Sequence, residues 1–524
     1  MKGKIEHKLV VALDIGSTYS GYAWQYRDEF ETNREPHFNT NWSVGTIQER
    51  EYEPRNILVE DHQSQKMTLF DVMKLFIEEL KKHCLQNFAN KRQKKVDEDK
   101  ILFVVTVPAI WSESAKAFMK NAAMAAGIGE ENVLLAREPE AAAISCMHLT
   151  SQQTEDLNNF SDVGQKFLVA DLGGGTADLL AVEVNKNGTL EVLHQSHGKD
   201  VGGQNINDAF MQLCHDSFQG KKWDETFGLC KYNIDGCFEN VKIQIEPSTS
   251  ENQTIQVDLP KEVTKALHEK TIASQKGSTF DEEEGCFIFE EKFVRKELFQ
   301  STCDTIYKSV IKDILIKDET KGITTVILVG GLSESPFVIE ILREKVKEDF
   351  PGVKVVVPDS PMKSVLLGAV LYGHDSEIIR NRISRETYGV ATNVIFDETK
   401  HDASKKVRNK ETGVFWCTGI FSIHVKKNQS VRLEQLQPRR VYKPMSLGQK
   451  SMTLPIYSSS NISPKYITDE GCKKIGKVEI KMPNTTGERD RKVEVRMLYG
   501  GTQIAVQANN VTTGEIVEAE IDFE

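Results

Sequence analysis

The 524-residue sequence predicts an α/β region made of two similar lobes, followed by a β-rich region. Up to about residue 380, strand-like apolar runs alternate with helix-like stretches, which is typical of helices packed on mixed sheets. Beyond residue 380 the runs are short and β-type, with turn signals between them. One strand-and-turn pattern also occurs twice in the α/β region, which indicates a duplicated lobe.

The individual elements follow from the apolar spacing. In the α/β region, strand-like and helix-like runs occupy residues 9–13, 69–84, 101–107, 114–126, 325–329 and 335–346. In the β-rich region, strand-like runs occupy residues 421–425, 451–457, 477–482, 492–498 and 502–508. The glycines of Tyr499-Gly500-Gly501 and Thr513-Gly514 mark turns on either side of the last run.

The charge is divided unevenly between the two regions. Residues 381–524 carry 23 basic and 17 acidic side chains, a net charge of +6, whereas the whole chain has a net charge of −11. Residues 1–380 therefore have a net charge of −17. This change of sign favours a domain boundary near residue 380.

Composition excludes several classes of protein. An acidic chain gives no general electrostatic reason to bind nucleic acid, so no nucleic-acid partner is expected. The longest strongly apolar run, residues 101–111, is half the length of the ~20 residues that a transmembrane helix needs. Nine scattered cysteines without a C-x-x-C pair are typical of reduced thiols. We expect a soluble, monomeric cytoplasmic protein without a transmembrane segment, and a nuclear location is also open.

The repeated pattern surrounds Asp14 and Asp171, which are 157 positions apart. In each copy a buried strand ends in the aspartate, a turn of glycine and hydroxyl residues follows, and a second apolar strand begins. Either copy alone is a common hairpin pattern, but the pair in register is more specific. Two similar lobes that face each other would bring both turns to one cleft.

Both turns have the chemistry of a phosphate-binding loop. Glycine lets backbone N–H groups approach a phosphate closely, and hydroxyl side chains add donors. The first turn contains Gly16, Ser17, Thr18 and Tyr19, and the second contains Gly173, Gly174, Gly175 and Thr176. Asp14 and Asp171 would repel the same phosphates unless a hard cation lay between them, and Mg²⁺ held largely through water is the natural choice.

Two further features belong to this candidate site. A third apolar strand ends at Gly330-Gly331, which either brings backbone close to a nucleoside or forms an ordinary strand-to-helix turn. Glu138-Pro139 precedes an alanine run and is typical of a helix start. Glu138 is then either a first-turn charge favoured by the helix dipole, or a carboxylate placed for the water shell of the metal or for the attacking water.

Five motifs in this order resemble the 70-kilodalton heat-shock protein family. They are VALDIGSTYS (11–20), VVTVPAIW (104–111), REPEAAAI (137–144), VADLGGGTAD (169–178) and VILVGGLSESP (326–336). Details such as Trp111 and the closing Val511-Thr-Thr-Gly-Glu look most similar to the divergent member-12 branch, of the 12A/12B type. The resemblance covers the chain from about residue 9 to its end, and the family is similar to actin and the sugar kinases in its two-lobed ATPase.

The resemblance implies an α/β, two-lobed actin-like ATPase fold with duplicated ribonuclease-H-like lobes, followed by a β-sandwich-like domain. The nucleotide-binding domain would span residues 1–380, with lobe I at about 1–165, lobe II at about 166–355 and a return to lobe I at 356–380. A β-rich, substrate-binding-like domain without a helical lid would span residues 381–524. The implied cofactors are ATP or ADP and Mg²⁺, and the implied partners are protein clients or signalling partners of the β-rich domain.

The resemblance also implies roles for individual residues. Asp14 and Asp171 match the aspartates that organise Mg²⁺, and Asp171 also helps to orient the attacking water. The implied catalytic residues are Asp14, Glu138, Asp171, Thr176 and Asp178. Residues 16–19 and 173–176 would form the two phosphate loops. The nucleoside would be held by Gly202, Gly203, Glu239, Lys242, Gly330 and Gly331.

Several positions depart from the family pattern. Ile243 and Glu334 stand where strongly active members clamp adenine between two arginines, so the cation–π contribution to base binding is missing. Gln204-Asn205 replaces an acidic pair. The interval between the first two motifs is short, and no lysine can be assigned to the γ-phosphate, because Lys74 falls in the following amphipathic helix.

Three functions are therefore open. The first, which we favour, is an ATP-binding, chaperone-like stress-response protein with weak Mg²⁺-dependent ATP hydrolysis. The second is a nucleotide-binding regulatory scaffold with little or no ATPase activity. The third is a sugar or metabolite kinase, for which we find no convincing hydroxyl-activating aspartate in a separate motif.

Overall fold

The chain folds into two compact units. The first comprises Met1–Ile110 and Ala122–Ile378, and the second comprises Trp111–Asn121 and Ile379–Glu524. The structure, a computed structural model, describes residues 7–16, 19–32, 36–43, 57–60, 66–93, 96–149, 160–195, 198–217, 223–247, 253–261, 263–264, 277–281, 283–410, 413–433, 435–444, 446, 448–483, 491–500 and 503–520. None of the helices in these ranges is long and apolar enough to cross a membrane.

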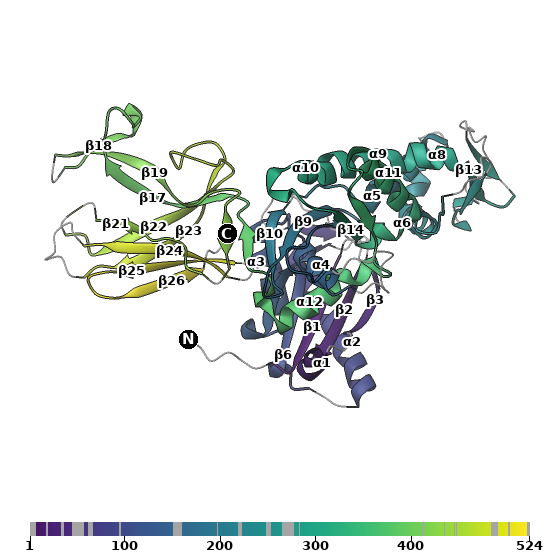
Figure 1. Cartoon of the computed structure of the whole chain (residues 1–524), viewed down its shortest axis with the longest axis horizontal. Helices are drawn as coiled ribbons and strands as arrows, with labels where there is room; N and C mark the ends of the chain where they lie inside the picture. The colour runs from purple at the N-terminus through teal and green to yellow at the C-terminus, as the bar shows by residue number, and fades with distance from the viewer. Residues whose placement is uncertain are drawn as a thin grey trace. The chain divides into compact units, whose positions relative to one another are not determined.

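The first unit contains two five-stranded sheets, and one of them is built from the N-terminal part of the chain (Figure 1). Its strands, in spatial order, are β3 (His37–Ser43), β2 (Tyr19–Tyr26), β1 (Leu9–Ile15), β6 (Ile101–Val107) and β7 (Val133–Arg137). β1 is antiparallel to β2 and parallel to β6, and β6 is parallel to β7. The carboxyl ends of β1, β6 and β7 therefore lie at one edge of this sheet.

Helices from both ends of the first unit cover this sheet. They are α1 (Arg27–Glu31), α2 (Leu69–Arg92), α4 (Glu138–Met147) and α12 (Ser364–His374). The predicted helix over 69–84 continues to Arg92, since Gln93 adopts the left-handed conformation that ends it. α12 packs on α4, β1 and β6, so a helix near residue 370 completes a core begun near residue 9. Helix α3 (Glu113–Ala125) is divided between the two units.

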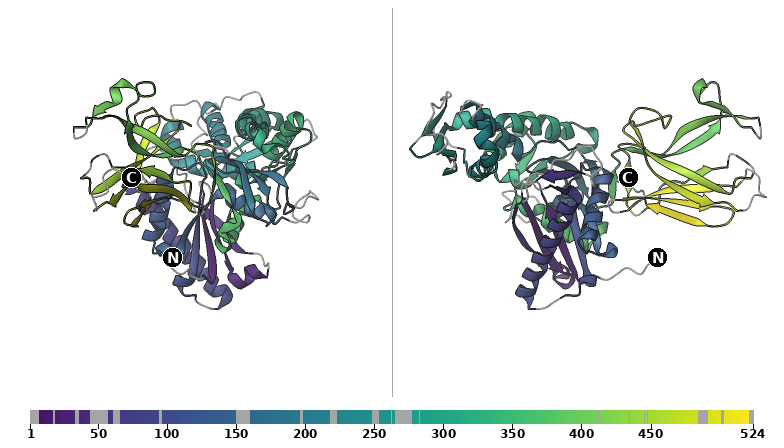
Figure 2. Two further views of the ribbon diagram at one scale, coloured as in Figure 1. Left: turned by 60° about the vertical axis from the view of Figure 1, so that its left-hand side comes forward. Right: turned by 180° about the vertical axis from the view of Figure 1, so that it is seen from behind.

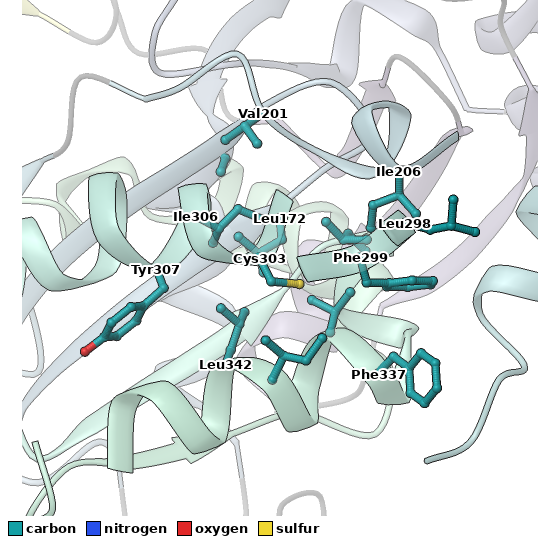
Figure 3. Close-up of a cluster of buried hydrophobic side chains, with 14 of the residues drawn as sticks. Leu172, Val201, Ile206, Leu298, Phe299, Cys303, Ile306, Tyr307, Phe337 and Leu342 are labelled. Carbon is teal, nitrogen blue, oxygen red and sulfur yellow. The ribbon is translucent and has the colours of Figure 1, made fainter. Parts of the chain in front are cut away.

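The second sheet lies in the middle of the chain. Its strands, in spatial order, are β10 (Leu190–Gln195), β9 (Ala177–Val184), β8 (Lys166–Leu172), β14 (Thr325–Val329) and β15 (Lys354–Val356). The longer helices of this region are α5 (Gly203–Ser217), α6 (Trp223–Lys242) and α11 (Pro336–Asp349). These helices share one apolar core with the sheet. Leu172, Val201, Cys303 and Ile306 lie together in this core (Figure 3).

The two sheets have the same strand order and the same directions. β8 is antiparallel to β9 and parallel to β14, as β1 is to β2 and β6. β15 continues the parallel series beside β14, as β7 does beside β6. The duplicated lobe predicted from the repeat is therefore present as two sheets of identical topology, each with its aspartate near the end of the central strand.

Smaller elements complete the first unit. A short hairpin joins β4 (Leu58–Glu60) to β5 (Lys66–Thr68). A three-stranded sheet has the order β11 (Thr254–Asp258), β13 (Cys286–Glu290) and β12 (Ser278–Asp281). The helix that follows comprises α8 (Glu291–Phe293), α9 (Gln300–Ile306) and α10 (Lys312–Leu315), with π-helical turns at Val294–Phe299 and Tyr307–Ile311 between them.

The second unit is a β-sandwich, as the sequence predicts for its β-rich region. One sheet contains β18 (Lys406–Arg408), β19 (Phe415–Val425), β17 (Thr387–Ile395), β22 (Ser451–Ser459) and β23 (Cys472–Lys481). The other contains β21 (Arg440–Tyr442), β24 (Val493–Gly500), β25 (Gln503–Asn510) and β26 (Ile516–Glu520). Side chains from both sheets, such as Val390 and Val506, share one core, and Figure 2 shows the two layers. A separate pair joins β16 (Asn381–Ile383) to β20 (Ser430–Arg432).

Arg491 is a buried arginine that supports this sandwich. Its guanidinium donates hydrogen bonds to the carbonyl oxygens of Gln449 at 2.5 Å, Met482 at 3.4 Å and Ser446 at 3.4 Å. We expect Arg491→Met to lower the free energy of unfolding of this unit by about 2–4 kcal/mol, because buried carbonyls lose their donor. Urea unfolding measures the loss of stability, with Arg439→Met, at a mostly exposed arginine, as the control. Equal effects of the two substitutions would contradict this role.

Candidate functional site

The candidate aspartates lie near strand ends in both sheets. Asp14 is the sixth residue of β1, and Asp171 is the sixth residue of β8. Asp178 lies directly opposite Asp171 in the antiparallel pair of β8 and β9, so the two side chains project from the same face. In the first sheet, the Oγ1 hydroxyl of Thr106 donates a hydrogen bond to Oδ1 of Asp14.

Glu138 joins this group from helix α4. It is the first residue of α4 and follows β7 directly, and Pro139 in the first turn suits a helix start. Because β7 is parallel to β6 and β1, the start of α4 lies at the same sheet edge as Asp14. The charges of Asp14, Asp171 and Asp178 all act on Glu138. The structure therefore brings the four predicted carboxylates into one electrostatic cluster.

The carboxylates in this cluster disfavour one another's ionisation. Burial raises the pKa of Asp171 to about 8, and the charges of Asp178 and then Asp14 add to the increase. Burial raises the pKa of Asp14 to about 6, opposed by the hydrogen bond from Thr106. Burial, followed by the charges of the three aspartates, raises the pKa of Glu138 well above its ordinary value. A positive charge placed among these groups would relieve the repulsion.

The cluster fits a magnesium ion that keeps most of its water. Within the described ranges, no three His, Cys, Asp or Glu side chains are placed to hold a metal ion together. Mg²⁺ commonly binds through one or two carboxylates, substrate phosphates and several waters, so it does not need a complete protein cage. Asp14 and Asp171 are the carboxylates from the two central strands and would hold such an ion between the lobes.

The second predicted phosphate loop, residues 173–176, is held by the start of helix α5. The N–H of Gly203 donates to the carbonyl oxygen of Gly173 at 3.1 Å, and the N–H of Gln204 donates to that of Gly174 at 2.7 Å. A Cβ on Gly202 would lie 2.6 Å from both carbonyl oxygens, so only glycine permits this contact. Gly175 and Thr176 are half-buried in the same loop. The predicted association of residues 173–176 with Gly202 and Gly203 is thus a direct backbone contact.

The first phosphate loop is described in part. Gly16 follows β1 and is half-buried, and Tyr19 begins β2. The predicted phosphate contacts Ser17 and Thr18 lie outside the described residues.

The third glycine segment approaches Asp171 closely. Gly330 has a φ of +84°, which side chains other than glycine rarely adopt, and its Cβ would lie 2.5 Å from the carbonyl oxygen of Leu172 and 2.6 Å from Oδ1 of Asp171. No atom of the described residues lies within 4 Å of the corresponding position on Gly331. Gly330 therefore lets the loop after β14 pass beside the carboxylate, and Gly331 is open on its side-chain face.

The residues predicted to hold the nucleoside lie near the end of α6. The ammonium group of Lys242 donates to Oε2 of Glu239 at 2.5 Å, and the side-chain amide of Asn207 donates to the same oxygen at 2.8 Å. Both α6 residues are therefore tied to helix α5. Ile243 and Glu334, which depart from the family pattern, lie close to Lys242. Ile243 is the next residue after α6, and Glu334 precedes Ser335, whose hydroxyl donates to the carbonyl oxygen of Lys242. Burial raises the pKa of Glu334, and the charge of Lys363 lowers it in part.

Lys74 lies within α2, in agreement with its predicted position in the amphipathic helix. It is separated along the chain from the strand ends that carry the carboxylates. No described contact assigns it to them, and Lys74 stays without a role in the candidate site.

A polar contact joins the two lobes beside Glu138. Arg137, the last residue of β7, donates from Nη1 to Oε1 of Gln195, the last residue of β10, at 3.4 Å. Its guanidinium also lies 3.6 Å from the Glu140 carboxylate. β7 and β10 are the outermost strands of the two sheets. This contact therefore joins the two outermost strands at the point where α4 begins.

Three polar residues of the site were not predicted from the sequence. Thr106 lies within a motif that carries the resemblance, but its hydroxyl had no assigned role. Asn207 and Gln195 had no signal in the sequence, because each acts on a residue more than 30 positions away.

Two lobes of identical topology, each with an aspartate beside glycines at the end of its central strand, define the class of actin-like ATPase folds. Comparison with known families agrees and is more specific. Residues 45–449 match the Hsp70 protein family, and the chain belongs to that family.

Individual relatives place the chain near one branch of the family. It is 26% identical over 526 residues to Heat shock 70 kDa protein 12A of Homo sapiens, covering 88% of this chain and 76% of the relative. It is 28% identical over 519 residues to Heat shock 70 kDa protein 12B of Homo sapiens, covering 84% and 73%. It is 27% identical over 379 residues to Chaperone protein DnaK of Endomicrobium trichonymphae, covering 69% and 53%. The resemblance to the member-12 branch is confirmed.

Proposed function

We propose that this protein binds ATP with Mg²⁺ between its lobes and hydrolyses it slowly, as a chaperone-like member of the Hsp70 family. The observation that carries the proposal is the convergence of Asp14, Glu138, Asp171 and Asp178 beside a glycine loop held by helix α5. Four mutually repelling carboxylates, of which Asp171 and Asp178 are buried and Asp14 and Glu138 half-buried, are costly in a protein without a cationic ligand. A magnesium–polyphosphate complex supplies that charge and also the anion that the loop N–H groups suit.

Each part of the site has a proposed task. Asp14 and Asp171 hold the water shell of the metal, and Asp171 orients the attacking water. Glu138 and Asp178 order that water through hydrogen bonds. Residues 16–19 and 173–176 bind the phosphates, with Thr176 next to the terminal one, and the metal contributes charge neutralisation. Hydrolysis then depends on positioning and electrostatics, not on covalent chemistry.

The division of labour along the chain is also part of the proposal. Residues 1–380 form the nucleotide-binding domain, and residues 381–524 form a substrate-binding-like domain that contacts protein clients or signalling partners. We place the protein in the cytoplasm, with a nuclear location also open, as a monomer with a role in the stress response. The Hsp70 family match and the names of the relatives support the chaperone-like part of this proposal.

A regulatory scaffold that binds ATP with little hydrolysis is the second candidate. It is favoured by Ile243 and Glu334 at the predicted base positions and by the position of Lys74 within α2, where no described contact joins it to the carboxylates. In that case ATP would set the angle between the lobes without being consumed.

Calorimetric titration of the full chain with ATP and Mg²⁺ tests both candidates. We expect binding by the wild type, about tenfold weaker binding by Thr176→Val, and a fall of about a hundredfold in phosphate release for Asp171→Asn. Asp216→Asn, at an exposed aspartate of α5, is the matched control and should change neither quantity. Absence of binding by the wild type would refute both candidates. If wild type and Asp171→Asn release phosphate at the same rate, the ATPase candidate is refuted and only the regulatory scaffold remains.

A further inference from the structure

Lys242 is the most deeply buried cation of the candidate site. It is the last residue of α6, and only 2% of its side chain is exposed. Its ammonium group donates to the carbonyl oxygen of Gly203 at 3.2 Å, to Oδ1 of Asn207 at 2.9 Å and to Oε2 of Glu239 at 2.5 Å. A lysine ammonium has three N–H donors, and three acceptors of the protein occupy them. No donor remains for a ribose hydroxyl.

The acceptor on Gly203 connects Lys242 to the second phosphate loop. The same residue, Gly203, donates its own N–H to the carbonyl oxygen of Gly173, and Gln204 donates to Gly174. A Cβ on Gly203 would lie 2.9 Å from Nζ of Lys242 and 3.8 Å from Cα of Gly174, so these groups are in close contact. The position of the ammonium group therefore sets the position of the first turn of α5, which in turn holds the loop.

The backbone of Lys242 connects it to the third glycine segment. Its carbonyl oxygen accepts a hydrogen bond from the buried Oγ hydroxyl of Ser335 at 3.1 Å. Ser335 directly follows the turn Gly331–Glu334 and precedes α11. One residue thus fixes, through its side chain and its carbonyl group, two of the glycine segments that approach Asp171.

The apolar core prevents this arrangement from shifting. Val201 and Ile206 flank the start of α5 and lie in the same core as Leu172 (Figure 3). The side chain of Lys242 is almost fully buried, and leaving its charge unpaired there would be costly. The three hydrogen bonds are therefore a permanent part of the fold.

We propose that Lys242 is a positioning residue that holds the phosphate loop of residues 173–176 in its binding conformation, and that it does not contact the nucleoside. This differs from the role that the family resemblance implies, and it rests on the proposed function for its nucleotide. Glu239 keeps its second carboxylate oxygen, Oε1, for the sugar. Loss of Lys242 should then weaken the phosphate contacts equally whether or not a nucleoside is attached.

The test compares three ligands, each with Mg²⁺: ATP, 2′-deoxy-ATP and inorganic tripolyphosphate. For Lys242→Met we expect the dissociation constant of tripolyphosphate to rise about tenfold or more, and those of the two nucleotides to rise at least as much, because Lys242 also holds the carboxylate of Glu239. The ³¹P shifts of bound tripolyphosphate should also move, which a general loss of stability would not cause. Weaker binding of ATP with unchanged binding of tripolyphosphate would overturn the proposal, because it would make Lys242 a ligand of the nucleoside.

Two further variants keep the test independent of folding. Asn207→Ala removes one acceptor and leaves the lysine in place, so it should weaken the binding of tripolyphosphate by a smaller factor than Lys242→Met does. Lys347→Met, at an exposed lysine of α11, is the matched control and should change none of the three affinities. An effect of Asn207→Ala on the two nucleotides but not on tripolyphosphate would contradict the proposal.

Hydrogen exchange of the ligand-free protein separates this proposal from the proposed function. We expect faster exchange at the amides of Gly203 and Gln204 in Lys242→Met than in wild type, since their loop acceptors are no longer held. If wild type binds none of the three ligands, the proposed function fails. Exchange at these two amides still tests whether Lys242 fixes the loop. Unchanged exchange in Lys242→Met would overturn the proposal that Lys242 is a positioning residue.

Discussion

Substitution of Gly368 by alanine should destabilise the first unit by about 3 kcal/mol or more. Gly368 lies in α12, where that helix crosses α4, and a Cβ there would lie 1.6 Å from the carbonyl oxygen of Ala141. The obstacle is backbone, so no side-chain rotation can remove the overlap, and the helices must move apart. Differential scanning calorimetry of the full chain measures the loss as a lower unfolding temperature of the first unit.

The same substitution should also disturb the candidate site, because Glu138 begins the helix that is displaced. We expect weaker binding of ATP with Mg²⁺ in Gly368→Ala even at temperatures where the variant stays folded. Gly236→Ala is the control, since Gly236 lies in α6 and, among the residues that the structure describes, no atom comes within 4 Å of its side-chain position. That control should be neutral or stabilising by about 0.5–1 kcal/mol. Similar stabilities of the two variants would show that α4 and α12 are not in close contact.

Replacing Asp171 by asparagine should stabilise the ligand-free protein at alkaline pH. An ordinary aspartate has a pKa of 3.8, whereas Asp171 has one of about 8 in the folded protein. Between these values the folded state keeps a proton that the unfolded state releases, so this group's contribution to stability falls as the pH rises through that window. Asparagine has no charge to lose, so the variant should be more stable than wild type by roughly 1–4 kcal/mol at pH 8.5.

The dependence on pH distinguishes this effect from a change in packing. The difference between Asp171→Asn and wild type should shrink as the pH falls, to less than about 1 kcal/mol at pH 4.5. Chemical unfolding at a series of pH values measures it, with Asp216→Asn as the control at an exposed position. A difference that stays constant with pH, or a destabilised variant at pH 8.5, would contradict the electrostatic explanation.

The sequence predicted the parts of the fold that depend on local pattern. The strands that end in Asp14 and Asp171 are continuous apolar runs, and burial of both faces of a central strand produces such runs. The repeat predicted two lobes, and the equal strand order of the two sheets confirms them. The start of α4 at Glu138 was signalled by the proline that follows it.

Contacts between distant segments could not be predicted in the same way. The hydrogen bond between Lys242 and Asn207 spans 35 positions, and the one between Ser335 and Lys242 spans 93. Hydrophobic periodicity specifies which face of a helix is buried, but it does not specify which polar atom meets which. For this reason the family resemblance could place Lys242 at the site, but the sequence could not tell whether its donors face a ligand or the protein.

The position of α12 has a consequence for how the chain folds during synthesis. The sheet of β1 and β6 and the helix α4 are complete by residue 147, but α12, which covers them, ends at His374. At ~5–20 residues per second, a ribosome needs roughly 10–50 s to make the intervening chain. The second lobe lies within that interval and can close its own core first. Until α12 emerges, the surfaces of α4, β1 and β6 on which it packs stay open to solvent, and exposed apolar surface of this kind favours aggregation.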